Sequence, residues 1–184
     1  MFQSSITQCY VVHDKDRIYQ GDILKDVELC FCENKDVVEI SCPYIVILSQ
    51  DCDLLQCRCN ECSSDRENNQ YLPNVIVFPA FVDENLREGN HLFDIYGIKQ
   101  RKINSDQFRE IKANNNPRYH YLKRNTEFEL ANLIIDFKLY YTVPYHDLKQ
   151  KYEGSYVATL NELFREHLSQ RFSNYLSRIG LPEI

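Results

Sequence analysis

The chain has 184 residues, of which 43% are hydrophobic and 26% are charged, and its formal net charge is −6 at neutral pH. This balance is typical of an ordinary soluble globular protein with one domain, or with one domain and a helical appendage. No apolar run approaches the roughly 20 residues of a membrane span, and the first residues lack the pattern of a signal peptide. We therefore expect a cytoplasmic protein with no membrane partner.

Cysteine and charge are both distributed unevenly. All eight cysteines lie between Cys9 and Cys62. In a reducing cytoplasm, this clustering favours metal ligation or buried thiols over disulfides. Residues 1–62 contain 11 acidic and 5 basic side chains, whereas residues 99–124 contain 8 basic and 2 acidic ones.

The first half of the chain alternates between strand patterns and turns. Residues 17–24, RIYQGDIL, predict a glycine turn that leads into a strand. Residues 26–33 alternate and predict a strand, and the continuous apolar run at 42–50 predicts a strand that is buried on both faces. The polar, cysteine-rich stretch at 57–70 predicts a loop.

The next segments predict two more strands and a helix. Residues 74–81, NVIVFPAF, predict a strand in which Pro79 favours a sheet edge or a bulge. Residues 105–113 predict a short helix with Ser105 as its N-cap. Residues 131–143 predict one long strand.

The C-terminal segment has the clearest helical pattern. Thr159 and Glu162 have the spacing of a capping box, and apolar residues then recur at helical spacing. Gly180 and Pro182 are typical of a helix end. The pattern predicts a helix at about 160–179 that packs on the sheet, with binding of a partner as the alternative.

Three of these motifs in order resemble a known family. QGDIL, CPYIVILSQD and LPNVIVFPAF are similar, over residues 17–82, to the PemK/MazF toxin family. The resemblance implies an α+β fold with a small, strongly bent, SH3-like antiparallel β-barrel. We expect a barrel domain at 1–145 with an inserted cysteine-rich loop at 52–70, and a C-terminal helical extension at 146–184 that packs on the barrel.

The resemblance does not extend to the chemistry of the family. Toxins of this family are endoribonucleases that cut single-stranded RNA without a metal. Where the family has an arginine before the strand proline, this chain has Cys42, and the later threonine falls near Pro79 and Ala80. A thiol cannot replace a guanidinium on phosphate. We therefore expect a non-catalytic or altered member, which binds RNA or a partner in a prokaryotic toxin–antitoxin or phage-defence setting.

The basic segment around residues 116–125 is a candidate for contact with nucleic acid. Cations beside aromatic rings suit single-stranded RNA, because phosphates pair with the charges and bases stack on the rings. The candidate residues are Arg118, Tyr119, Lys123 and Arg124. Strand alternation predicts that Tyr119 and Tyr121 face the core and that Arg118 and His120 face outward. A solvated strand without a ligand is the alternative.

The same segment allows an alternative function as an endoribonuclease. In that hypothesis Arg118 stabilises charge on the phosphate, His120 transfers a proton, and Asp51 or Asp53 assists. It requires the three side chains to meet in one cleft.

A second alternative is a zinc-stabilised adaptor for a protein partner or a homodimer. Cys52, Cys57, Cys59 and Cys62 provide four thiols for one zinc ion, although their spacing differs from that of two standard knuckles. Reduced thiols on an exposed loop are the competing interpretation. A nucleophilic role for Cys52 is disfavoured by its carboxylate neighbours, which raise the pKa of a thiol.

Overall fold

The computed structural model describes residues 8–33, 36–60 and 71–178. Within these ranges the chain forms eight strands and six helices. In chain order they are β1 (Tyr10–Val11), β2 (Asp22–Glu33), β3 (Asp36–Ile47), α1 (Asp51–Asn60), β4 (Asn74–Val82), α2 (Asp83–Arg87), α3 (Phe93–Tyr96), α4 (Ser105–Lys112), β5 (Tyr119–Leu122), β6 (Leu133–Asp136), β7 (Tyr141–Pro144), α5 (Tyr145–Ser155), β8 (Tyr156–Leu160) and α6 (Glu162–Leu176). None of these helices has the length and apolar character needed to cross a bilayer.

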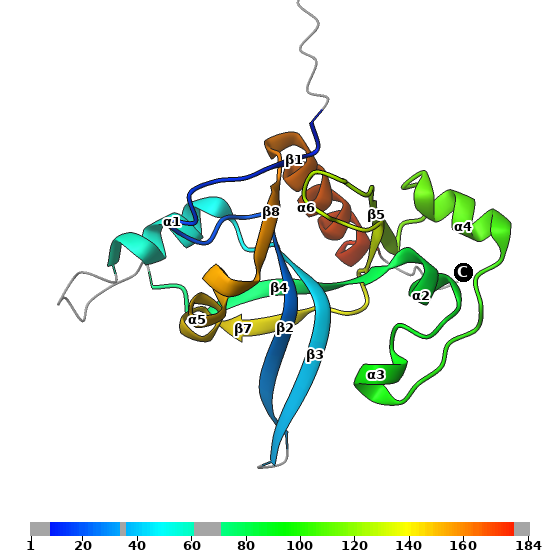
Figure 1. Cartoon of the computed structure of the whole chain (residues 1–184), viewed down its shortest axis with the longest axis horizontal. Helices are drawn as coiled ribbons and strands as arrows, with labels where there is room; N and C mark the ends of the chain where they lie inside the picture. The colour runs from blue at the N-terminus through cyan, green and yellow to red at the C-terminus, as the bar shows by residue number, and fades with distance from the viewer. Residues whose placement is uncertain (1–7, 34–35, 61–70, 179–184) are drawn as a thin grey trace, which may run out of the picture.

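The strands form one antiparallel sheet in the order β1-β8-β2-β3-β4-β6-β5, and β7 pairs with β4. The sheet bends into an open half-barrel, from which β2 and β3 extend as a long hairpin (Figure 1). The three motifs at 17–82 contribute the neighbouring strands β2, β3 and β4. The α+β class and the bent antiparallel arrangement predicted from the sequence are therefore confirmed.

The central strands explain the position of Pro79. Ile45, Val46 and Ile47 of β3 are all fully buried, as the continuous apolar run predicts. On the far side of β4, β7 pairs as far as Val77 and β6 pairs from Ala80. Pro79 therefore lies where the neighbour of β4 changes, and its missing N–H leaves no ladder hydrogen bond unmade.

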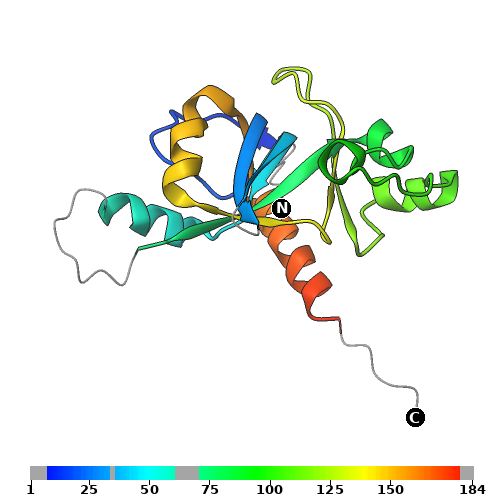
Figure 2. The same cartoon turned by 90° about the horizontal axis from the view of Figure 1, so that it is seen from below.

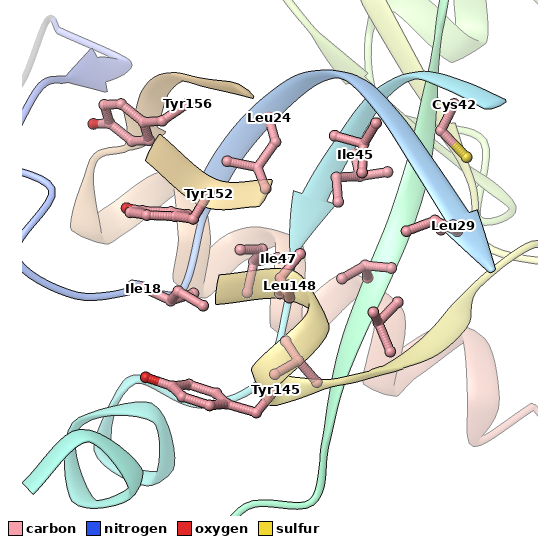
Figure 3. Packing of buried hydrophobic residues seen from close by; sticks show 14 of the residues in the cluster. Ile18, Leu24, Leu29, Cys42, Ile45, Ile47, Tyr145, Leu148, Tyr152 and Tyr156 are labelled. Carbon is pink, nitrogen blue, oxygen red and sulfur yellow. The ribbon is translucent and has the colours of Figure 1, made fainter. Parts of the chain in front are cut away.

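One face of the sheet is covered by α5. Figure 3 shows aromatic and aliphatic side chains of α5 packed against those of β2 and β3. The buried residues that meet there include Leu24, Leu29, Ile45, Ile47, Tyr145, Leu148 and Tyr152. Burial of this apolar area is the main force that holds α5 on the hairpin.

The other face is covered by α6, as the amphipathic pattern predicts. Leu168 and Phe172 are buried against the sheet. The ring of Phe172 lies 4.8 Å from that of Phe78 and 5.6 Å from that of Phe137, measured between centroids. In Figure 2, helix α6 begins near the centre of the sheet and its C-terminal end points away from it.

The start of this helix differs from the prediction. Helix α6 begins at Glu162, with Asn161 as N-cap, whose side chain accepts a hydrogen bond from the backbone N–H of Glu162 at 2.7 Å. Thr159 is not a cap, because it lies in β8 and its hydroxyl donates to the buried carboxylate of Asp22. The predicted stop at Gly180 and Pro182 lies outside the described residues.

Two further boundaries were mispredicted. The segment 131–143 is not one strand, since a turn separates β6 from β7 and each pairs with a different part of β4. The N-cap of α4 is Asn104, not Ser105, and its side chain accepts from the N–H of Gln107 at 2.9 Å. The cap of α4 is thus one residue earlier than predicted, whereas the turn between β6 and β7 was not predicted at all.

The predicted loop at 52–70 is helical in its first part. Residues 51–60 form α1. Asp51 and Asp53 lie in its first turn, where negative charge interacts favourably with the helix dipole. Leu54 and Cys57 lie three residues apart on one side of α1, and both are buried in the core. The remainder of that loop, at 61–70, lies outside the described residues.

The segment 146–184 is not purely helical. Strand β8 separates α5 from α6 and pairs with both β1 and β2. The predicted C-terminal extension therefore contributes a strand to the same sheet as the rest of the chain.

Candidate functional site

A cleft of about 720 Å³ opens between the end of β3, the start of α1, β4 and α6. The glycine turn that precedes β2 shapes its inner end. Gly21 has a φ of +88°, and a Cβ at this position would lie 3.1 Å from the Cβ atoms of Arg165 and Leu160. Only glycine combines this backbone conformation with such a close approach of α6. The turn therefore fixes where Arg165 enters the cleft.

Asp51 forms the first charged group at this end of the cleft. Its carboxylate accepts two hydrogen bonds from the Arg17 guanidinium, at 3.1 and 2.8 Å, and one from the backbone N–H of Gln20 at 3.2 Å. Partial burial alone would raise the pKa of Asp51, but these bonds outweigh it and the pKa is lowered. Asp51 therefore stays ionised and serves to hold Arg17, which stacks on the Tyr19 ring at 3.5 Å.

Arg165 is the second cation of the cleft, and its hydrogen-bonding state is different. Its side chain is 18% exposed and lies 3.8 Å from both Asp51 and Glu162, beyond hydrogen-bond distance. Its Nε atom is buried without an acceptor. Among the residues described, none accepts a hydrogen bond from this guanidinium, although Arg can donate five.

The other polar groups of the cleft divide into an inner and an outer set. The inner set is already bonded: Gln20 donates to the carbonyl of Leu48 and to the hydroxyl of Ser169, and Ser49 accepts from the N–H of Ile76. The outer set is exposed and includes Asp53 and Glu166. A ligand in the cleft would therefore meet Arg165 as a donor and these two carboxylates as acceptors.

Two of the residues proposed for a nuclease, Arg118 and Asp51, have different ion-pair partners. Arg118 donates through Nε at 2.8 Å and through a second nitrogen to the buried carboxylate of Asp136. Asp51, by contrast, is paired with Arg17. Arg118 and Asp51 thus belong to two separate ion pairs.

His120 does not face outward as strand alternation predicted. Its side chain is 3% exposed, and burial, together with the nearby charge of Arg171, lowers its pKa to about 3. Strand β5 is covered on one side by α4 and on the other by α6, so both of its faces are internal. A histidine with this pKa stays neutral at neutral pH.

Only some of the residues predicted to contact nucleic acid are accessible to a ligand. Lys123 and Arg124 are exposed. Tyr119 is 8% exposed and packs among apolar residues that include Phe108 and Ile111 of α4, so its ring offers no free face for a base. Arg118 is held by Asp136, as described above.

A surface that the sequence analysis missed lies at α3 and the segment after it. Phe93 is 57% exposed and Tyr96 is 46% exposed, and both precede the exposed cations Lys99 and Arg101. We call these four residues the basic–aromatic surface. A hollow of about 360 Å³ beside it is lined by Phe93 and Lys99 together with Asn85 and Asn90. The net charge of 99–124 indicated the cations, but the aromatic residues before position 99 went unnoticed.

The cysteine positions neither form nor exclude the predicted zinc site. Cys57 is buried in the core and Cys52 is exposed, and five residues on a helix separate them by about 140° around its axis. The side chains of Cys59 and Cys62 lie outside the described residues. Within the described part of the chain, no cluster of three or more His, Cys, Asp or Glu is placed to hold a metal ion. Zinc binding stays a prediction.

The comparisons with known proteins add no relative. No protein-family model matches the chain, and a search of curated proteins returns no match. The candidate sites therefore rest on the geometry of this chain alone.

Proposed function

We propose that this protein is a cytoplasmic PemK/MazF-like barrel protein that binds single-stranded RNA and does not cleave it efficiently. We place it in a toxin–antitoxin or phage-defence setting, because its motifs at 17–82 resemble that family. The bent antiparallel arrangement of β2, β3 and β4 is compatible with a small barrel of that kind. A protein partner, or a second copy of the chain, is compatible with this role.

The observation that carries the RNA proposal is the basic–aromatic surface. An exposed ring offers a face on which a base can stack, and nearby cations pair with phosphate. Phe93 provides the ring and Lys99 the cation at the same hollow, where Asn85 and Asn90 add amide groups. Lys123 and Arg124 supply further exposed cations. This combination suits a flexible single strand better than a rigid duplex, whose bases are already stacked.

Three features support the non-catalytic part of the proposal. Cys42, at the position of the arginine in the family, is fully buried, and burial raises the pKa of its thiol to about 12. Ala80 is also fully buried and has no hydroxyl. His120 has a pKa near 3 and lies inside the fold. None of these groups is suited to acid–base chemistry on a phosphodiester.

The test is the salt dependence of binding to a labelled, unstructured RNA strand. Each phosphate contact contributes about 0.7 to the slope of log affinity against log salt for a single strand. The double variant Lys99→Ala/Arg101→Ala should therefore lower the slope by about 1.4. Phe93→Ala should weaken binding by about 1–3 kcal/mol, because one base loses its stacking platform.

A matched control is Lys25→Ala, which removes an exposed cation from the β2–β3 hairpin, away from the basic–aromatic surface. It should leave the slope unchanged. A loss of about 0.7 in the control, the same per charge removed as in the double variant, would mean that binding depends on net charge alone and would contradict the proposal. Multiple-turnover cleavage of the RNA would contradict its non-catalytic part.

A further inference from the structure

The cleft beside α1 is separate from the basic–aromatic surface. Figure 1 shows α1, which borders the cleft, and α3, which contains Phe93 and Tyr96, on opposite sides of the molecule. Its chemistry can therefore be considered independently of the surface at α3.

The state of Arg165 shows which ligand atoms the cleft can recognise. The Arg165 guanidinium is mostly buried and donates to none of the described residues, so the compensation for its lost hydration there is the charge of Asp51 and Glu162, each 3.8 Å away. Asp51 accepts its hydrogen bonds from Arg17 and Gln20 instead. The two terminal nitrogens of Arg165 can therefore donate parallel hydrogen bonds to a ligand with two adjacent acceptors.

The charges around the cleft limit the ligand further. Asp53 and Glu166 are exposed on the same lining, so the cleft holds more carboxylates than guanidinium groups. Such a lining repels a phosphate or another multiply charged anion within the cleft, so the phosphate of a bound nucleotide would have to stay outside it, in solvent. It favours a neutral group that presents acceptors to Arg165 and N–H donors to the carboxylates.

A guanine base combines these features. Its O6 and N7 atoms form the adjacent acceptor pair that an arginine fork binds in the commonest specific contact with nucleic acid. Its N1–H and exocyclic amino group are donors suited to Asp53 and Glu166. Adenine would set an amino group against the Arg165 fork, and the pyrimidines lack the paired acceptors on one edge.

The cleft also has apolar side chains against which a base can pack. Leu48, Ile76 and Leu176 line the cleft beside the polar groups, and Leu176 is among the exposed large apolar side chains of the described chain. A planar ring laid against them removes apolar area from water.

We propose that the cleft formed by α1, β4 and α6 binds a guanine base, with Arg165 donating to O6 and N7 and with Asp53 and Glu166 accepting from its N–H groups. The base comes from a free guanine nucleotide or from an unpaired residue of RNA. The RNA source rests on the proposed function above, whereas the free nucleotide does not.

The first experiment measures equilibrium binding of the four ribonucleoside 5′-monophosphates to the purified full chain by calorimetry. Guanosine monophosphate should bind at least about tenfold more tightly than the other three, given the usual discrimination of a bidentate contact. Its 7-deaza analogue, which lacks the N7 acceptor, and inosine monophosphate, which lacks the amino group, should each bind more weakly. Equal binding of all four nucleotides, or of none, would overturn the inference.

The second experiment uses R165K, which keeps the charge but removes the fork. It should weaken the binding of guanosine monophosphate about tenfold or more. The thermal unfolding midpoint should stay close to that of the parent. The control is R178K, because Arg178 is exposed, follows the end of α6 and stacks on Tyr175, and it is not among the residues that line the cleft. Unchanged guanine affinity in R165K would overturn the inference.

The third experiment separates the two proposals. Single-stranded RNA made only of uridine is compared with the same strand carrying one guanosine. Tighter binding of the guanosine strand, lost in R165K, supports the RNA source. If both strands bind alike through Lys99 and Arg101, the proposed function stands and the guanine site is overturned for RNA. If guanosine monophosphate binds but neither strand does, the guanine site stands and the RNA function falls.

Discussion

Two arginines on α6, six residues apart, differ in the hydrogen bonds of their terminal nitrogens, although the Nε of each is buried without an acceptor. Arg171 donates to the backbone carbonyls of Asn114, Asn116 and Tyr119, and so ties α6 to β5 and to the turn before it. Arg165 donates to no described residue and faces a cleft of about 720 Å³. The hydrogen bonds that its terminal nitrogens make, rather than charge or exposure, therefore distinguish a structural arginine from one that is available to a ligand.

Leu168 gives the largest expected effect, because it holds the helix segment between the two arginines against the sheet. It is fully buried in the cluster that includes Phe78 and Phe137. Leu168→Ala should cost about 2–5 kcal/mol of unfolding free energy through lost transfer energy and a residual cavity. Chemical denaturation measures this loss. A cost below about half a kcal/mol would show that α6 is not held by its apolar face.

Substitution of each arginine by Met tests whether the two side chains contribute differently to the stability of the fold. Arg171→Met leaves three backbone carbonyls without their charged donor and should cost about 2–3 kcal/mol. Arg165→Met removes a guanidinium that bonds to none of the described residues, so it should change stability by no more than about half a kcal/mol. Equal losses in the two variants, measured by denaturant unfolding, would contradict the assignment of different roles.

His120 provides a smaller, pH-dependent test on the Arg171 side of α6. Burial, Arg171 and His167 lower its pKa from an unfolded value near 6.5 to about 3. Below pH 6.5 the unfolded chain binds a proton that the folded chain does not, so stability falls as the pH drops towards 3. The slope from this residue is at most about 1.4 kcal/mol per pH unit.

The control for this prediction is the variant His120→Gln, whose side chain has no titrating group. Its unfolding free energy should depend less on pH than that of the parent between pH 6.5 and 4. If the two proteins show parallel pH profiles, His120 is not the buried neutral group inferred above.

Local sequence patterns predicted the long strands of the sheet. They misassigned residues whose structure depends on partners that are distant in the sequence. Strands β2, β3 and β4 were predictable because each contains a long apolar or alternating run. Strand β8 was missed because its five residues precede a helix, and its buried Leu160 was assigned to the helical stripe. Thr159 matched a capping box, but the tertiary bond to Asp22 uses its hydroxyl. Such long-range partners leave no local signal in a sequence.

The candidate sites were predictable only where one segment supplies them. The cations of 99–124 were visible in the sequence, and part of them belong to the basic–aromatic surface. The cleft brings together Gln20, Asp51 and Arg165, which are far apart in the chain, so no spacing rule could link them. His120 was placed outside because alternation assumes one solvated face, whereas α4 and α6 cover β5 on both sides.

The most direct test of the different roles of the two arginines is an NMR titration that follows their Nε–H signals while guanosine monophosphate is added. The Nε–H signal of Arg165 should shift with the added nucleotide and saturate, because the terminal nitrogens of the same guanidinium acquire acceptors. The signal of Arg171 should stay in place, because its terminal nitrogens already donate to backbone carbonyls and Arg171 is not among the residues that line the cleft. A shift at Arg171 with none at Arg165, or no shift at either, would contradict the account.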